Sequence, residues 1–408
     1  MTDTTPTPTQ LPVLATTYCP FCAVIVPDSR YCGACGAHLA HAGFRGSQRL
    51  HSYAAFPDEP VVRLSTVTSL FPQLSHRAKA PFRTALSVIV LLLVVFALAG
   101  TAAPLMAVCA LGVPLLFILY ILEVDPYEGT FILPTTIALL LGAGLGAGWA
   151  LVSGRYVDQA LQPLPSASLT NGHTIVAAVV VPTVAQLLMC IPIVVVRVMQ
   201  RGVLESLDGF VVGATGALGF TLAGTVVLLA PWLTNGQFTH QSFLTNLSQA
   251  AVRGLSLPLI SAMSTGLIAA AVWVTRGGIT AARGRWITSP ALALLIAETI
   301  QIGSAFSNLA VLPNADLIVV QLAAIGALTV LMRVGIHHVL IHEAHDVSIG
   351  APRVCAHCSH LVPTMSFCPQ CGVADRAIAR PRRAQGPTGQ FPSDSPSAVA
   401  PPAREPDG

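Results

Sequence analysis

Charged residues are scarce in this chain of 408 residues: only 10% are Asp, Glu, Lys or Arg, whereas 53% are hydrophobic, and the mean hydropathy is +0.69. Ordinary soluble domains carry about 25% charged residues, so an ordinary soluble globular protein is excluded. Between Thr84 and Ile341, only 16 of 258 residues are charged. The net charge of +3 is too small to indicate a nucleic-acid partner. The composition indicates a polytopic membrane protein with polar ends.

Eight apolar runs occupy the middle of the chain, and each approaches the ~20 residues that cross a bilayer as a helix. The runs are expected near 84–100, 104–122, 131–152, 173–199, 207–233, 254–275, 287–306 and 315–335. The sequence therefore predicts an α-helical polytopic membrane protein with about eight transmembrane helices, a domain of residues 84–341 embedded in the lipid bilayer. Two runs carry glycines at helical spacing, which predicts close helix packing: Gly142, Gly144, Gly146 and Gly148, and Gly209, Gly213, Gly216 and Gly219.

The distribution of Lys and Arg around these runs predicts the orientation. With the N-terminus in the cytoplasm, nine basic residues flank the inner ends of the runs and only Arg155 and Arg253 fall outside. The inner nine are Arg77, Lys79, Arg83, Arg197, Arg201, Arg276, Arg283, Arg285 and Arg333. An even number of spans returns the chain to the side where it began. We therefore expect a multi-pass protein of the cell membrane with both termini in the cytoplasm.

Eight of the ten cysteines form two clusters with the same spacing, C-x2-C-x9-C-x2-C. The ligands expected are Cys19, Cys22, Cys32 and Cys35 near one end and Cys355, Cys358, Cys368 and Cys371 near the other. No signal peptide is expected in the Thr/Pro-rich start, and cysteines in a reducing compartment favour metal over disulfides. Four thiolates suit a closed structural zinc site. The sequence predicts two structural zinc ions in two small zinc ribbons, with His38, His41, His357 and His360 as bystanders.

The polar ends complete the predicted domain organisation. We expect a disordered tail at 1–16, a zinc ribbon at 17–39, a juxtamembrane linker at 40–83, the membrane domain at 84–341, a second ribbon at 350–374 and a disordered Pro-rich tail at 375–408. Such ribbons usually serve as structural or partner-binding modules. An unidentified cytoplasmic protein is the partner that this organisation suggests.

The middle of the chain also resembles a known family. The segments V-P-T-V-A-Q-L-L-M-C-I-P at 181–192 and L-D-G-F-V-V-G-A-T-G-A-L-G-F at 207–220 are similar to the PrsW family of intramembrane metalloproteases, and Tyr120 to Glu128 is similar to the acidic loop after that family's second helix. The family typically shows P-x-x-E-E-x-x-K, then L-D-G-x-V-Y-G-x-x-x-G-x-G-F, then E-N. The resemblance covers roughly residues 70 to 340.

The resemblance also implies which catalytic residues are missing. The family's paired glutamates fall on Ala185 and Gln186 and its lysine on Met189. The Glu-Asn pair falls on Gly224 and Thr225, and the later histidine falls near Pro258. Hydrolysis by a metal-bound water needs metal ligands and a base. The resemblance therefore implies a degenerate relative, with no catalytic residue assigned.

Two further polar groups within the apolar region remain as candidate sites. Glu298 lies inside the run 287–306, where a carboxylate is costly and often functional. Gln301 and Gln186 are its expected neighbours in a possible intramembrane polar site. His338, His342 and His345 share one face where the last helix is expected to continue past the bilayer, either as a solvated helix end or as a metal or proton sensor.

Three functions remain open from the sequence. The first is a non-catalytic membrane scaffold or partner-binding component with cytoplasmic zinc ribbons. The second is an intramembrane metallopeptidase with substituted ligands, and the third is a small-solute or ion transporter that uses Glu298.

Overall fold

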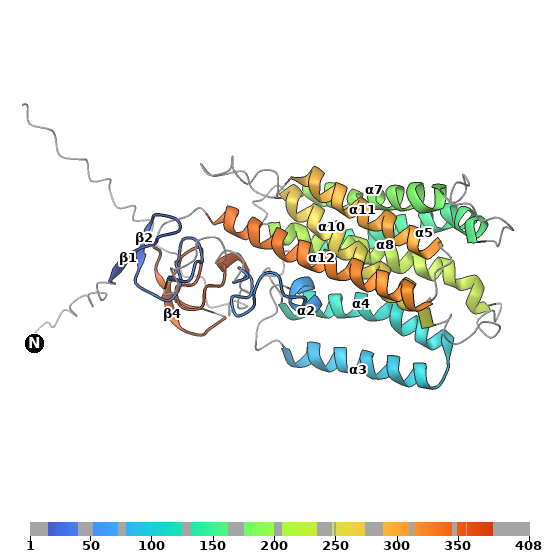
Figure 1. Cartoon of the computed structure of the whole chain (residues 1–408), viewed down its shortest axis with the longest axis horizontal. Helices are drawn as coiled ribbons and strands as arrows, with labels where there is room; N and C mark the ends of the chain where they lie inside the picture. The colour runs from blue at the N-terminus through green and yellow to red at the C-terminus, as the bar shows by residue number, and fades with distance from the viewer. Residues whose placement is uncertain are drawn as a thin grey trace, which may run out of the picture.

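The computed structural model is an elongated helical bundle with two small cysteine-rich units at one end (Figure 1). The structure describes residues 15–39, 52–71, 79–124, 132–161, 175–199, 206–234, 247–248, 250–273, 289–309, 314–344, 349–355 and 357–377. The predicted fold class, a mostly helical membrane protein with a cysteine cluster near each end, is confirmed. The tails expected at 1–16 and 375–408 lie mostly outside the described residues.

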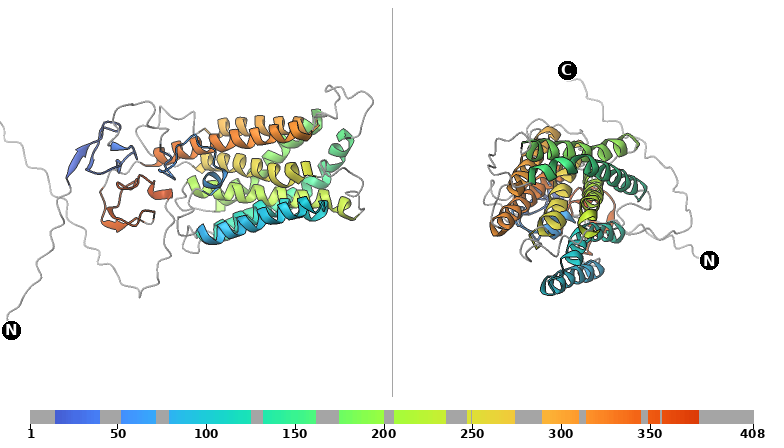
Figure 2. Two further views of the ribbon diagram at one scale, coloured as in Figure 1. Left: turned by 60° about the horizontal axis from the view of Figure 1, so that its bottom comes forward. Right: turned by 90° about the vertical axis from the view of Figure 1, so that its right-hand side faces the viewer.

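The bundle helices run roughly along the long axis of the molecule (Figures 1 and 2). They are α3 (Lys79–Leu98), α4 (Ala102–Val124), α5 (Ile132–Leu161), α7 (Val181–Met199), α8 (Ser206–Thr234), α10 (Leu257–Trp273), α11 (Pro290–Leu309) and α12 (Asn314–Glu343). Two π-helical segments, η2 (Val176–Val180) and η4 (Ala250–Ser256), precede α7 and α10.

Seven of the described helical segments are long and apolar enough to cross a membrane. They correspond to all the apolar runs expected from the sequence except the first. That first run forms α3, whose apolar segment Phe82–Leu98 is shorter. Gly100, with φ of +66°, makes the tight turn from α3 to α4 because glycine adopts this left-handed backbone without strain.

Helix α8 is the centre of the bundle, and every residue from Ser206 to Thr221 is buried. Its glycines allow two neighbouring helices to approach closely. A methyl group at Gly213 would come within 2.7 Å of the Thr265 carbonyl oxygen of α10. On the other side, Gly142 and Gly146 of α5 lie against the α8 backbone at Gly216 and Phe220. The close packing predicted from the glycine spacing is therefore confirmed, although the interleaved Gly144 and Gly148 face open space.

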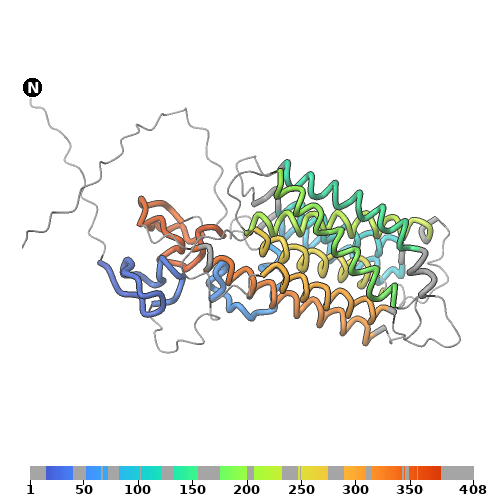
Figure 3. The backbone as a smooth tube through the Cα atoms, turned by 90° about the horizontal axis from the view of Figure 1, so that it is seen from above, coloured from blue at the N-terminus to red at the C-terminus, as the bar shows by residue number. Residues whose placement is uncertain are grey.

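Each cysteine-rich unit is built on a two-stranded antiparallel hairpin. The N-terminal ribbon pairs β1 (Thr16–Tyr18) with β2 (Ile25–Pro27), and the C-terminal ribbon pairs β3 (Pro352–Val354) with β4 (Leu361–Pro363). A 3₁₀ turn, η5 (Asp375–Ala377), ends the second ribbon. The two ribbons lie side by side at the end of the bundle that α12 reaches (Figure 3).

Residues 52–71, within the expected linker, form a folded segment that we call the cap segment. It includes the short helix α2 (Thr66–Leu70) and buries Tyr53, Phe56, Val61 and Phe71 in the main hydrophobic core. The Phe71 ring contacts Phe82, Phe117 and Tyr120, with ring centroids 4.8, 5.8 and 4.9 Å away. The cap segment is thus part of the packed end of the bundle.

Candidate metal centres and polar sites of the bundle

Within each ribbon, four cysteine sulfurs converge on one point. The sulfurs of Cys19 and Cys35 are 3.8 Å apart and those of Cys22 and Cys32 are 3.7 Å apart. In the second ribbon, the Cys355–Cys371 and Cys358–Cys368 distances are 4.0 and 3.9 Å. Tetrahedral zinc with Zn–S bonds of about 2.3 Å places its sulfurs about 3.8 Å apart, whereas disulfide sulfurs are about 2.05 Å apart. The quartets therefore fit a tetrahedral thiolate metal site.

Tight turns bring the sulfurs together in the same way in both ribbons. In the first ribbon, the Ala23 amide donates to the Cys19 carbonyl and the Gly36 amide donates to the Cys32 carbonyl. Ser359 and Gly372 make the corresponding bonds in the second ribbon, to Cys355 and Cys368. Each of these four donors has a positive φ, between 60° and 77°. The regular spacing of the cysteines in the sequence thus reflects two copies of one fold.

The quartets favour a bound dication electrostatically. Hydrogen bonding from the Cys35 thiol and from nearby backbone amides lowers the pKa of Cys32 to about 5. Burial, together with the charge of Cys32, raises the pKa of Cys22 to about 12. In the second ribbon, hydrogen bonds from Cys368 and Cys371 lower the pKa of Cys355. Because metal ligands must be deprotonated, a bound dication is needed to compensate the charge of four neighbouring thiolates.

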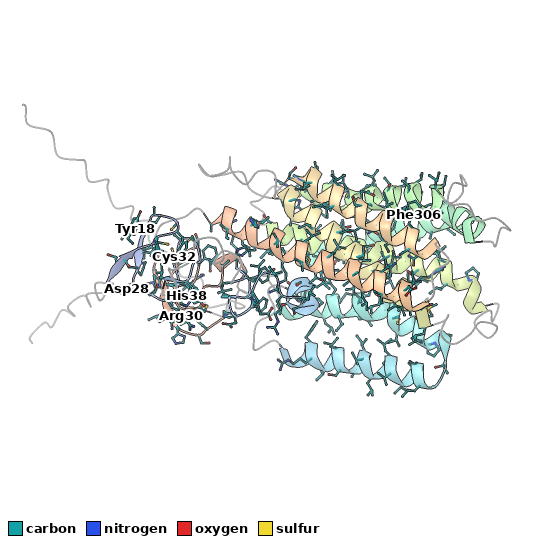
Figure 4. The ribbon with its side chains drawn as sticks, in the orientation of Figure 1. Tyr18, Asp28, Arg30, Cys32, His38 and Phe306 are labelled. Carbon is teal, nitrogen blue, oxygen red and sulfur yellow. The ribbon has the colours of Figure 1, made fainter. Side chains whose placement is uncertain are left out.

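The histidines near the quartets make other contacts. His38 accepts a hydrogen bond from Nε of Arg30 at 3.3 Å and lies edge-on to the Tyr31 ring. Figure 4 shows Arg30, Cys32 and His38 together in the N-terminal ribbon. Nδ1 of His360 lies 2.9 Å from the carbonyl oxygen of Cys358. His41 lies outside the described residues.

Inside the bundle, two of the three predicted polar residues meet. Nε2 of Gln301 donates to Oε1 of Gln186 at 3.4 Å and to the Ser261 hydroxyl at 3.3 Å. Gln186 is fully buried, and it also donates to Thr265 at 3.1 Å and accepts from Ser264 at 3.3 Å. These residues form one amide–hydroxyl network that joins α7, α10 and α11.

Glu298 is the third of these predicted polar residues. Its carboxylate oxygens are shielded from solvent, and neither makes a hydrogen bond in the described part of the chain by distance and angle. Thr183 and Cys190 of α7 are its electrostatic neighbours. In the described chain no hydrogen bond joins Glu298 to Gln186 or Gln301, although Cys190 neighbours both Gln186 and Glu298.

The histidine face predicted on the last helix is described only in part. Helix α12 continues to Glu343, and Nδ1 of His338 lies 2.8 Å from the carbonyl oxygen of Val334, one turn earlier. The side chain of His342 and the whole of His345 lie outside the described residues. The neighbouring His337, which the sequence analysis did not single out, is buried and accepts a hydrogen bond from the Ala54 amide at 3.2 Å.

The most connected polar residue of the bundle is Arg333, which the sequence analysis treated as one flanking charge among nine. Its side chain is fully buried, and its Nη2 is 3.1 Å from Oε2 of Glu59. Its other nitrogens donate to the Val61 carbonyl at 3.0 Å and to the Thr68 hydroxyl at 2.7 Å. The guanidinium lies 4.4 Å from the centre of the Tyr53 ring. A basic residue inside the apolar run 315–335 was the sequence signal for this site.

These observations define a polytopic membrane protein that carries two four-cysteine metal ribbons. The model of the family described as PrsW family intramembrane metalloprotease matches residues 133–351, more than half of the chain. The chain belongs to this family. No curated protein and no solved structure matches it.

Proposed function

We propose that this chain is a member of the PrsW family without protease activity, which acts as a membrane scaffold for a partner bound through its zinc ribbons. The observation that supports this most directly is the environment of Gln186. There, where the resemblance implies paired glutamates, the structure has an amide bonded to Gln301, Ser264 and Thr265. Amides and hydroxyls stabilise helix packing but are poor bases and poor zinc ligands.

The metal-binding groups support the same proposal. Across the described ranges, the groups of three or more His, Cys, Asp or Glu that could hold a metal are the two cysteine quartets. Both lie outside the membrane helices, and both contain four ligands. A catalytic zinc usually has three protein ligands and one open position, so these closed quartets fit structural zinc.

The orientation proposed for this scaffold places both ribbons in the cytoplasm. The ribbons are hydrogen-bonded to each other, which supports an even number of crossings between them. Counting α3 as a span in addition to the seven longer segments gives eight. The Lys/Arg distribution favours the cytoplasm for the shared end, and reduced thiols are stable there.

Metal content and peptide cleavage of the purified full-length protein test the proposal together. We expect two zinc ions per chain and no chelator-sensitive cleavage of membrane-embedded peptides, in the wild type and in Glu298→Gln alike. A third zinc with cleavage that Glu298→Gln abolishes would instead establish a peptidase with substituted ligands.

One observation favours a second candidate function. The carboxylate oxygens of Glu298 are shielded from solvent within the apolar helix α11, and intramembrane carboxylates often bind protons or ions in transporters. Reconstitution into liposomes with a pH-sensitive dye distinguishes the two functions. Proton or ion flux that Glu298→Gln removes supports transport, and equal, background-level signals from both proteins support the scaffold.

A further inference from the structure

The two ribbons pack against each other with matched contacts. The Tyr31 amide of the N-terminal ribbon donates to the Pro369 carbonyl at 2.9 Å, and the Phe367 amide of the C-terminal ribbon donates to the Gly33 carbonyl at 2.9 Å. Tyr31 and Phe367 hold the same position in the repeated motif, directly before the third cysteine. The ribbon interface is therefore close to two-fold symmetric, although both halves belong to one chain.

The residues of this interface are direct chain neighbours of the metal-binding cysteines. Tyr31 and Gly33 directly flank Cys32, and Phe367 and Pro369 directly flank Cys368. The Phe367 ring lies on Gly36, where an added methyl group would be 2.7 Å from it, and the Tyr31 ring lies in the same way on Gly372. Those glycines directly follow the fourth cysteine of each quartet. Each ribbon therefore packs against residues that flank the cysteines of the other ribbon.

The symmetry breaks at one residue. Met365 of the C-terminal ribbon is buried in the small core of the N-terminal ribbon, with Cys19, Val26, Cys32 and Ala34. The corresponding residue of the first ribbon is Ser29, whose hydroxyl donates to its own backbone at Pro27 and Tyr31. The C-terminal ribbon therefore supplies a side chain to the core of the N-terminal ribbon, whereas Ser29 supplies none to the core of the C-terminal ribbon.

The C-terminal ribbon packs in turn on the bundle. Its residues Phe367, Val373 and Ala374 belong to the main core together with Tyr53 and Phe56 of the cap segment. The Ala374 amide donates to the Ala54 carbonyl at 2.8 Å, and the Ala54 amide donates to His337 of α12 at 3.2 Å. Ala54 thus links the second ribbon to the bundle through its own backbone.

We propose that the C-terminal ribbon, when it binds metal, holds both the N-terminal ribbon and the cap segment in place. We call this metal-dependent arrangement the latch. Metal in the C-terminal quartet keeps the N-terminal ribbon packed on the C-terminal ribbon and keeps the cap segment seated on α12. Metal in the N-terminal quartet keeps only its own ribbon folded. A thiolate-seeking dication such as zinc therefore controls whether the end of the bundle at Arg333 and His337 is covered. The latch is independent of whether the bundle cleaves peptides.

Substitutions of corresponding cysteines in the full-length protein test whether the N-terminal ribbon and the cap segment depend on the C-terminal ribbon. Zinc-loaded Cys32→Ser and Cys368→Ser in lipid nanodiscs are compared with the wild type by hydrogen exchange and by zinc content. Cys32→Ser should lose amide protection only at 15–39. Cys368→Ser should lose protection at 349–377, at 15–39 and at 52–71, and its remaining zinc should bind roughly 10- to 100-fold more weakly. The latch is wrong if each variant affects only its own ribbon, or if both release the cap segment equally.

A second pair of variants leaves every cysteine in place. Met365→Ala should weaken zinc binding by the N-terminal quartet while the C-terminal quartet keeps its affinity, and Leu361→Ala at an exposed position of the same ribbon should change neither. Chelator titration of the wild type adds an arm that requires no mutation. Exposure of 52–71 should accompany the loss of zinc from the C-terminal quartet, whichever quartet releases its zinc first. Exposure of 52–71 while the C-terminal quartet keeps its zinc would overturn the proposed dependence.

Discussion

Nη2 of Arg333 lies 3.1 Å from Oε2 of Glu59, in a pair that joins the last helix to the cap segment across 274 positions of the chain. The arginine is fully buried and the glutamate is mostly buried, so each compensates the other's desolvation. The Thr68 hydroxyl accepts from Arg333 and donates to Glu59 at 2.9 Å. The pair therefore acts as the anchor of the cap segment.

Removing this arginine should release the cap segment. Arg333→Gln leaves the Glu59 carboxylate without its partner, and breaking a buried ion pair costs about 3–5 kcal/mol. We expect a lower midpoint in thermal unfolding and faster proteolysis at 52–71. Arg63→Gln removes an exposed charge of the same segment and should change neither measurement. Equal stability of the two variants would contradict the anchoring role.

The first knuckle of each ribbon offers a way to strengthen metal binding. In the described chain, Ala23 and Ser359 are the non-glycine residues with positive φ, at 60° and 61°. A residue with a Cβ atom is strained by about 1–2 kcal/mol in this left-handed conformation. Glycine removes the strain, but its greater conformational freedom in the unfolded chain offsets part of the gain. Ala23→Gly should therefore raise zinc affinity in chelator competition. Ala37→Gly, where φ is not positive, should lower it, and a decrease with both would refute this account.

Neighbouring glycines of α5 should differ sharply in their tolerance of a methyl group. Gly146→Ala would bring its new carbon against the Phe220 backbone, and overpacking of this kind costs about 1–3 kcal/mol. Gly148→Ala points into open space and should be neutral or slightly stabilising. Detergent-resistance and thermal-shift measurements on the purified variants compare the two. A Gly148→Ala variant as unstable as Gly146→Ala would show that α5 packs differently.

The amide network around Gln186 should support helix packing but not metal binding. Gln186→Leu removes the hydrogen bond donated to Thr265 and those accepted from Ser264 and Gln301, and interhelical bonds of this type contribute roughly 1 kcal/mol in a bilayer. We expect a small decrease in thermal stability with zinc content unchanged. Leu187→Ala alters an exposed residue of the same helix and serves as the control. A loss of zinc from Gln186→Leu would point to a metal site inside the bundle.

Local sequence signals were sufficient for the helices and the cysteine quartets. An apolar run of sufficient length predicts a membrane-spanning helix whatever its neighbours are. A C-x2-C turn likewise brings two sulfurs together without contacts to distant residues. The packing of the ribbons was not predictable in this way. The contacts of Tyr31 with Pro369 and of Arg333 with Glu59 join segments that are hundreds of residues apart, and neither end of the chain carries a local pattern that identifies the other.

The candidate polar sites also show that local sequence does not predict contacts between distant helices. Gln186 and Gln301 were correctly expected to be close, because both lie on apolar runs that must bury their amides. The side of α11 from which Glu298 points depends on how that helix rotates against α7, and hydropathy does not fix this rotation. The burial of Arg333 was missed for a similar reason, since a basic residue near the end of a span usually reaches the aqueous phase.

The contribution of Met365 to the core of the first ribbon sets an order on biosynthesis. The ribosome makes the N-terminal ribbon first, yet the side chain that completes this core is made only after the last membrane helix. The nascent chain must therefore carry an unfinished first ribbon, or one held by metal alone, throughout membrane insertion. The core of the first ribbon is therefore completed only after all the membrane helices have been synthesised.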